Sequence, residues 1–74
     1  MKDKTLEMIK NITITEIYNV LDKLAKLYEL KEKYKNAETI LERGNLHNAL
    51  VQIAILEERH DDLIREYKIC IKAE

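Results

Sequence analysis

The clearest pattern of apolar positions lies in the second half of the chain, where they recur at alternating spacings of three and four residues. This heptad spacing places all members on one face of a helix, as in coiled coils. A helix that is apolar over much of its circumference needs more than one neighbour to cover it. The face comprises Leu46, Ala49, Ile53, Leu56, His60, Leu63, Tyr67 and Cys70, widened by Leu50, Ile64 and Ile71 on one side and by Val51, Ile55 and Ile69 on the other.

A second apolar stripe runs through the first half of the chain and predicts another long helix. Thr13 and Glu16 have the spacing of a capping box, so we expect this helix to begin near residue 13 and to span about 14–43. The preceding residues, 1–12, fit a short helix or an arm packed on the rest. The stripe consists of Ile17, Val20, Leu24, Leu27, Leu30, Tyr34, Ala37 and Leu41.

The two stripes are separated by Gly44 and Asn45, which predict a tight turn. Glycine ends helices because it enters the left-handed conformation at little steric cost, and asparagine is a good N-cap for a helix over 46–73. So short a connection makes the two helices antiparallel neighbours. The sequence therefore predicts an all-α helical hairpin that forms a single domain over residues 1–74.

One hairpin is expected to be too thin to cover its own apolar side chains. The chain has ten Ile, ten Leu and two Val, and about half of them would stay in contact with water. Ordering one residue on folding costs about 1.5 kcal/mol of conformational entropy. The burial of such side chains must offset this cost. We therefore expect a homodimer that forms a four-helix bundle, with higher oligomers also open. In outline this dimer resembles the two-helix dimers of the plasmid copy-number regulator Rop. Its expected interface comprises Leu46, Ala49, Leu50, Ile53, Leu56, His60, Leu63 and Tyr67.

Composition and charge narrow the range of possible partners and of cellular compartments. The net charge of −1 argues against a partner attracted by bulk electrostatics, such as nucleic acid or anionic lipid. No apolar run is long enough to span a bilayer, and the first residues do not resemble a secretory signal. Cys70 is the single cysteine, which fits a reducing compartment. These features together predict a cytoplasmic protein without a membrane partner.

Candidate chemistry lies around His60. Glu57 and His60 form a Glu-x-x-His pair, whose side chains stack one turn apart on a helix, as in carboxylate-bridged di-iron bundles. The stretch 54–63 resembles the second metal helix of ferritin-like proteins, encapsulated ferritins in particular. This resemblance implies an iron or other divalent metal site, with Glu57 and His60 as ligands and Glu29 or Glu32 as the first-helix carboxylate.

Two other interpretations of His60 need no metal. In the first, His60 is a polar seam residue that fixes register, its imidazole hydrogen-bonded to Tyr28 or Glu29. In the second, it is a histidine that responds to pH.

The sequence contains no nucleophile triad, phosphate loop or zinc cluster, so no catalysis and no cofactor are expected. The favoured function is a small homodimeric adaptor or regulator that binds another macromolecule through its outer helix faces. The alternatives are the ferritin-like metal site and a nucleic-acid-binding dimer. The hypothesis of a nucleic-acid-binding dimer is based on five lysines that are scattered around the first helix among acidic residues: Lys23, Lys26, Lys31, Lys33 and Lys35.

Overall fold

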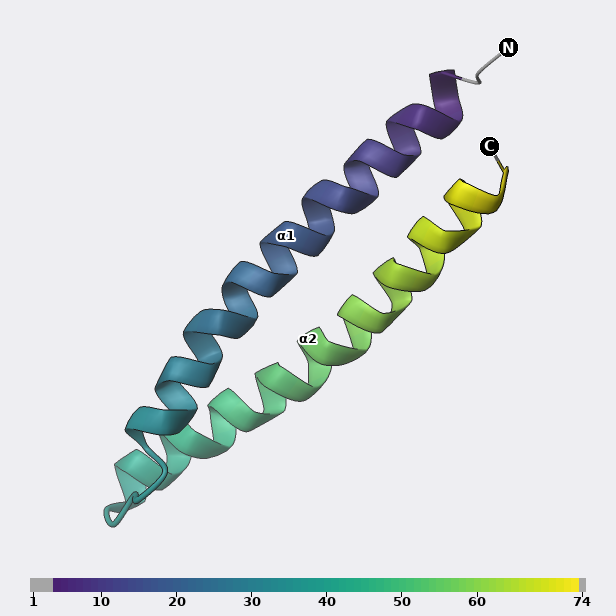
Figure 1. Cartoon of the computed structure of the whole chain (residues 1–74). Coiled ribbons are helices and arrows are strands. Elements are labelled where there is room, and N and C mark those ends of the chain that lie inside the picture. The colour runs from purple at the N-terminus through teal and green to yellow at the C-terminus, as the bar shows by residue number, and fades with distance from the viewer. Residues whose placement is uncertain (1–3, 74) are drawn as a thin grey trace.

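The chain folds into two long antiparallel helices joined by a short turn (Figure 1). The computed structural model describes residues 4–73. Helix α1 spans Lys4–Lys33 and helix α2 spans Ile40–Ala73, and together they form all the regular structure in the described range. The predicted all-α helical hairpin is confirmed.

The turn lies at residues 34–39, not at the predicted 44–45. Thr39 caps α2, because its Oγ1 accepts a hydrogen bond from the Glu42 backbone N–H at 3.1 Å. Its carbonyl oxygen accepts from the Arg43 N–H at 3.0 Å, which is the first bond of the helix. Gly44 therefore lies inside α2 with an ordinary helical backbone and no positive φ.

The predicted start of the first helix also needs correction. Thr13 lies in the middle of α1, where its Oγ1 donates to the carbonyl oxygen of Ile9 at 2.8 Å instead of capping a helix end. Residues 4–12 continue the same helix and do not form a separate short helix or arm. The first three residues of that predicted segment lie outside the described range. The first helix thus spans 4–33, not 14–43.

The heptad face of α2 packs against α1. All eight of its members are buried or half-buried, with Leu63 only 1% exposed. The matching seam of α1 begins nearer the N-terminus than predicted and uses Thr13, Ile17, Val20, Leu24 and Leu27. Leu30 and Leu41, which belonged to the predicted stripe, are 41% and 75% exposed. Leu30 follows Leu27 by three residues where the seam requires four, and Leu41 lies beyond the turn, at the start of α2.

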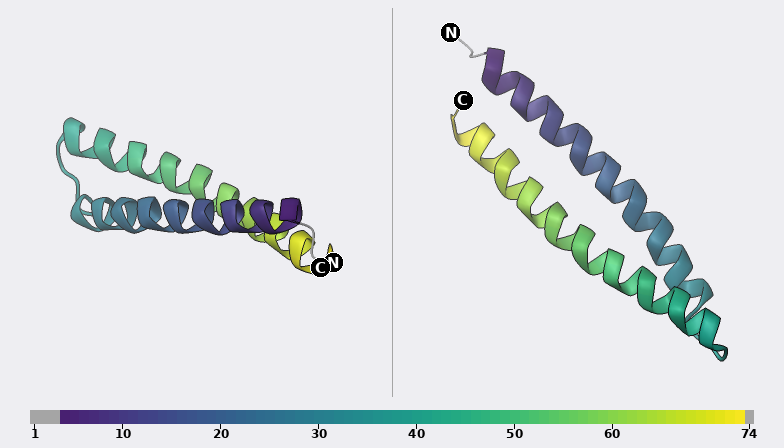
Figure 2. Two further views of the ribbon diagram at one scale, coloured as in Figure 1. Left: turned by 90° about the horizontal axis from the view of Figure 1, so that it is seen from above. Right: turned by 180° about the vertical axis from the view of Figure 1, so that it is seen from behind.

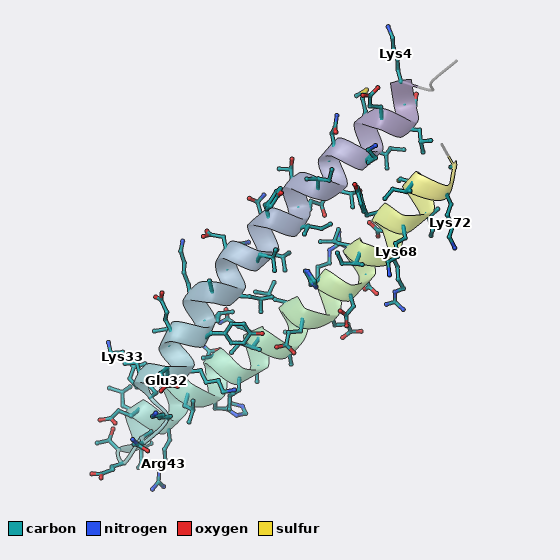
Figure 3. All side chains as sticks on the ribbon, in the orientation of Figure 1. Lys4, Glu32, Lys33, Arg43, Lys68 and Lys72 are labelled. Carbon is teal, nitrogen blue, oxygen red and sulfur yellow. The ribbon has the colours of Figure 1, made fainter. Side chains whose placement is uncertain are left out.

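The hairpin is a thin rod, and its two helices are inclined to each other (Figure 2). It measures 60 × 14 × 13 Å, with a Cα radius of gyration of 16.9 Å. A compact domain of this length has a radius of gyration of about 11 Å. Side chains project from the rod on all sides (Figure 3), including Lys4, Lys68 and Lys72 at one end and Glu32, Lys33 and Arg43 at the other.

Candidate functional site

The core seam divides the hairpin surface into two long sides. We label the seam positions of each helix a and d, so that e follows d and g precedes a. Two side-chain contacts show that like flanks of the antiparallel helices lie together: Tyr28 and Glu57, both at e, form a hydrogen bond, and Glu16 and Arg59, both at g, form an ion pair. The e side comprises Glu7, Ile14, Leu21, Tyr28, Arg43, Leu50, Glu57, Ile64 and Ile71, and the g side comprises Ile9, Glu16, Lys23, Leu30, Asn45, Gln52, Arg59, Glu66 and Ala73.

The e side is predominantly apolar and partly exposed. Leu21 is 43% exposed, Leu50 41% and Ile71 45%, while Ile14 and Ile64 are half-buried. Six of its nine residues are apolar or aromatic, and they recur along both helices between the charged residues Glu7 and Arg43 near the two ends of the rod. The hairpin therefore carries an apolar band on this side that α1 and α2 cannot cover for each other.

The g side is mostly polar and makes its own ion pairs. Arg59 Nη2 lies 2.7 Å from Glu16 Oε2, and its Nη1 lies 3.8 Å from Glu66 Oε1. These side chains are about half exposed, so each pair contributes at most about 1 kcal/mol to stability. Water solvates this side well, and it has less need of a covering partner than the e side.

An open groove of about 400 Å³ runs along the e side between the two helices. At its centre the Tyr28 hydroxyl donates to Glu57 Oε1 at 2.5 Å. This hydrogen bond raises the pKa of Tyr28 above its ordinary value, and desolvation adds to the effect. The groove is lined by Leu21, Leu24, Ala25, Tyr28, Glu57, His60 and Asp61.

The residues predicted to bind metal are only partly brought together. Glu57 and His60 line the same groove, as their spacing predicted. Glu29 does not line it, and Glu32 pairs with Lys35 Nζ at 2.6 Å, which lowers the pKa of the Glu32 carboxyl. Within residues 4–73, no three His, Cys, Asp or Glu side chains are placed to hold a metal ion.

The local partners of His60 also differ from those predicted for a polar seam residue. The Tyr28 hydroxyl bonds to Glu57 and not to the imidazole. The nearest carboxylate to His60 is that of its neighbour Asp61, with Nδ1 and Oδ1 3.9 Å apart. This difference arises because the turn precedes the predicted one, which shifts α2 along α1.

Most of the predicted dimer interface faces α1 of the same chain. Ala49, Ile53 and Leu63 are 3%, 6% and 1% exposed, so they have little surface left for a partner. Within the predicted set, Leu50 lies on the e side and is exposed. The e-side residues of α1 were absent from that set, although Leu21 and Tyr28 stand next to its predicted stripe.

The lysines that suggested a nucleic-acid surface are partly engaged within α1 and the turn. Lys26 lies 3.4 Å from Asp22, and Lys35 pairs with Glu32. Lys33 Nζ lies 5.4 Å from the centre of the Tyr34 ring. Because of these local partners, the lysines do not form a continuous positively charged surface along the first helix.

No family model, curated protein or solved structure matches this chain. Neither α1 nor α2, as far as the structure describes them, contains a stretch long and apolar enough to cross a bilayer. The most distinctive feature of the hairpin itself is the e side.

Proposed function

We propose that this chain is a self-associating interaction module in which two hairpins pack through their e sides into a four-helix bundle. The observation that carries this proposal is the pattern of three apolar positions per heptad, at a, d and e. Two helices that pack only on each other need apolar residues at a and d, whereas helices of a larger bundle add e or g. Here the third position is filled in both helices and lies on one side of the hairpin.

The surface area of one hairpin supports the same assembly. Its accessible surface is 6043 Å², whereas a compact monomer of this mass exposes about 4,800 Å². The excess is roughly 1,200 Å² per chain, and stable homodimers bury about 800 Å² or more from each partner. A second copy on the e side is therefore of a suitable size to cover the excess.

In this proposal the dimer serves as an adaptor or regulator that binds another macromolecule. Pairing of the e sides leaves several apolar side chains exposed on the outer surface of the bundle. Tyr18 is 68% exposed, Ile55 61% and Ile69 67%. These side chains supply apolar contacts for a protein partner, whereas the charged residues between them keep the bundle hydrated.

The alternative is a metal site that uses Glu57 and His60, both of which line the e-side groove. The first-helix carboxylate expected for such a site is Glu29 or Glu32, and neither lines this groove. Metal analysis after reconstitution with iron and other divalent ions tests this alternative. Stoichiometric metal that is lost in Glu57→Ala supports it, and its absence from the reconstituted protein argues against it.

Light scattering coupled to size-exclusion chromatography tests the self-association. We expect the mass of a dimer or a higher oligomer for the native chain, and a shift toward monomer for Leu21→Lys, because a lysine at e places a charge in the interface. Leu30→Lys is a matched control, since Leu30 is also on α1, is exposed to nearly the same extent and lies on the g side. A native chain that is a cooperatively melting monomer at micromolar concentration contradicts the proposal.

A further inference from the structure

The Tyr28–Glu57 pair lies between the midpoint of α2 and the turn. Because the helices are antiparallel, Leu21 lies opposite Glu57, and Tyr28 lies opposite Leu50 nearer the turn. Ile14 lies opposite Ile64, farther from the turn. The hydrogen bond between Tyr28 and Glu57 thus lies in the half of the e side that is closer to the turn. The half closer to the chain ends is lined by Ile14, Ile64 and Ile71, with Glu7 opposite Ile71.

Two symmetric arrangements can bring the e sides of two copies face to face. In the first, the two-fold axis runs along the rod, both turns lie at one end, and α1 packs on α2 of the other copy. In the second, the axis runs across the rod, the turns lie at opposite ends, and each helix packs on its own copy. Both arrangements cover the same apolar band, so apolar burial alone does not choose between them.

We propose that the Tyr28–Glu57 pair selects the first arrangement, with both turns at one end of the bundle. This inference rests on the proposed self-association through the e sides. In the first arrangement, Glu57 of one copy faces α1 of the other at the level of its Leu21 and Tyr28. A second tyrosine hydroxyl then lies near the carboxylate, which can accept hydrogen bonds from both copies.

The second arrangement leaves the same carboxylate in an unfavourable setting. With the rods fully overlapped, Glu57, which lies at the midpoint of α2, faces Glu57 of the other copy. The two carboxylates would lose water there and repel each other, and each would have Tyr28 of its own chain as its single donor. Burial of a charge without enough hydrogen-bond partners is costly, and this cost is the energetic difference between the two arrangements.

Distance measurements between spin labels on the two copies test the orientation. The background variant is Cys70→Ala, into which Asn36→Cys places one label in the turn and, in a separate protein, Lys72→Cys places one near the other end. We expect a short separation for both labels, a small fraction of the 60 Å length of the rod. Separations close to that length for both labels overturn the inference.

A second pair of variants tests the role assigned to the polar pair. Tyr28→Phe combined with Glu57→Leu removes the polar groups, so we expect short and long separations to appear together. Glu66→Leu is the control, because Glu66 is a glutamate of α2 on the g side, and it is expected to keep the single short separation. If the double variant also keeps a single short separation, the pair does not select the orientation.

The same samples distinguish this inference from the broader proposal. A dimer with its turns at opposite ends overturns only the orientation. A chain that light scattering finds to be monomeric gives no separation between copies, and it overturns the self-association itself. Circular dichroism of each variant establishes that the helices are retained.

Discussion

At the scale of single residues, the e-side groove shows how a short polar contact is set into an apolar surface. Tyr28 and Glu57 come from different helices and are 29 positions apart in the sequence, yet their oxygens lie 2.5 Å apart. The sequence suggested a different role for each residue, Glu57 as a metal ligand and Tyr28 as a hydrogen-bond partner of His60, and did not pair them with each other. Only the register between α1 and α2 brings the two side chains together.

The raised pKa of Tyr28 has a consequence for stability at alkaline pH. The folded chain holds the phenolic proton more tightly than the unfolded chain, so the stability from the neutral hydroxyl is fully present below pH 10.0, the ordinary pKa. It is lost as the pH rises through the raised pKa of the folded chain. We expect the free energy of unfolding to fall more steeply above pH 10.0 in the native chain than in Tyr28→Phe.

Urea denaturation at a series of alkaline pH values measures this difference. Tyr18→Phe is the control, since Tyr18 is 68% exposed and lies away from the groove. Equal slopes for the native chain and Tyr28→Phe would show that the Tyr28–Glu57 bond does not persist in solution.

At the scale of the helices, the existence of the hairpin could be predicted but its turn could not. The heptad face of α2 and the part of the α1 seam from Ile17 to Leu27 follow from spacing alone. The turn depends on competing local signals, since Gly44-Asn45 is a strong stop and start sequence. Thr39 and Glu42 have the spacing of a capping box, which is an equally good signal for the start of a helix. The second helix begins at this signal.

The error in the turn explains what sequence analysis missed in the candidate site. The turn lies nearer the N-terminus than predicted, which shifts every opposite pair between the helices. His60 was therefore expected beside Tyr28, whereas the structure places Glu57 there. The e-side residues of α2 were visible beside the seam, but their association with Leu21 and Tyr28 required the observed register.

Gly44 provides a test of the observed turn. It lies inside α2 without a positive φ, and an added Cβ would meet nothing within 4 Å. Because glycine in a helix interior loses more backbone entropy on folding than alanine, we expect Gly44→Ala to raise the free energy of unfolding by about 0.5–1 kcal/mol. Chemical denaturation followed by circular dichroism measures the change.

Ala54→Gly is the reverse substitution at an exposed position of the same helix, and it is expected to lower stability by a similar amount. A loss of stability in Gly44→Ala would instead place Gly44 in a left-handed helix end, at the turn that the sequence first suggested.

At the scale of the whole molecule, the shape of the hairpin dominates its energetics. A rod two helices wide has a high ratio of surface to volume, and only one line of side chains from each helix is fully covered. Val20, Leu24, Leu27, Ala49, Ile53 and Leu63 form that core. Ile17 and Leu56 pack partly against it, and the exposed large aliphatic residues contribute fully to stability only when another surface covers them.

Thermal unfolding at different protein concentrations measures how far stability depends on assembly. When folding and association are coupled, the midpoint temperature rises with concentration by mass action. We expect such a rise for the native chain and a smaller one for Leu21→Lys, whose e side is interrupted by a charge. A native midpoint that is the same across about a hundredfold range of concentration would indicate that one hairpin is stable alone.

The hairpin brings Lys4 and Lys72 to the same end of the rod, while the turn stands at the far end (Figure 3). If two copies pack with their turns together, all four chain ends emerge from a single pole. Fluorescent proteins or split-reporter halves joined to either terminus would then sit close to one another, and the opposite pole would stay clear. Anything joined to the termini would thus be gathered at one end of the bundle, and the end with the turns would stay accessible.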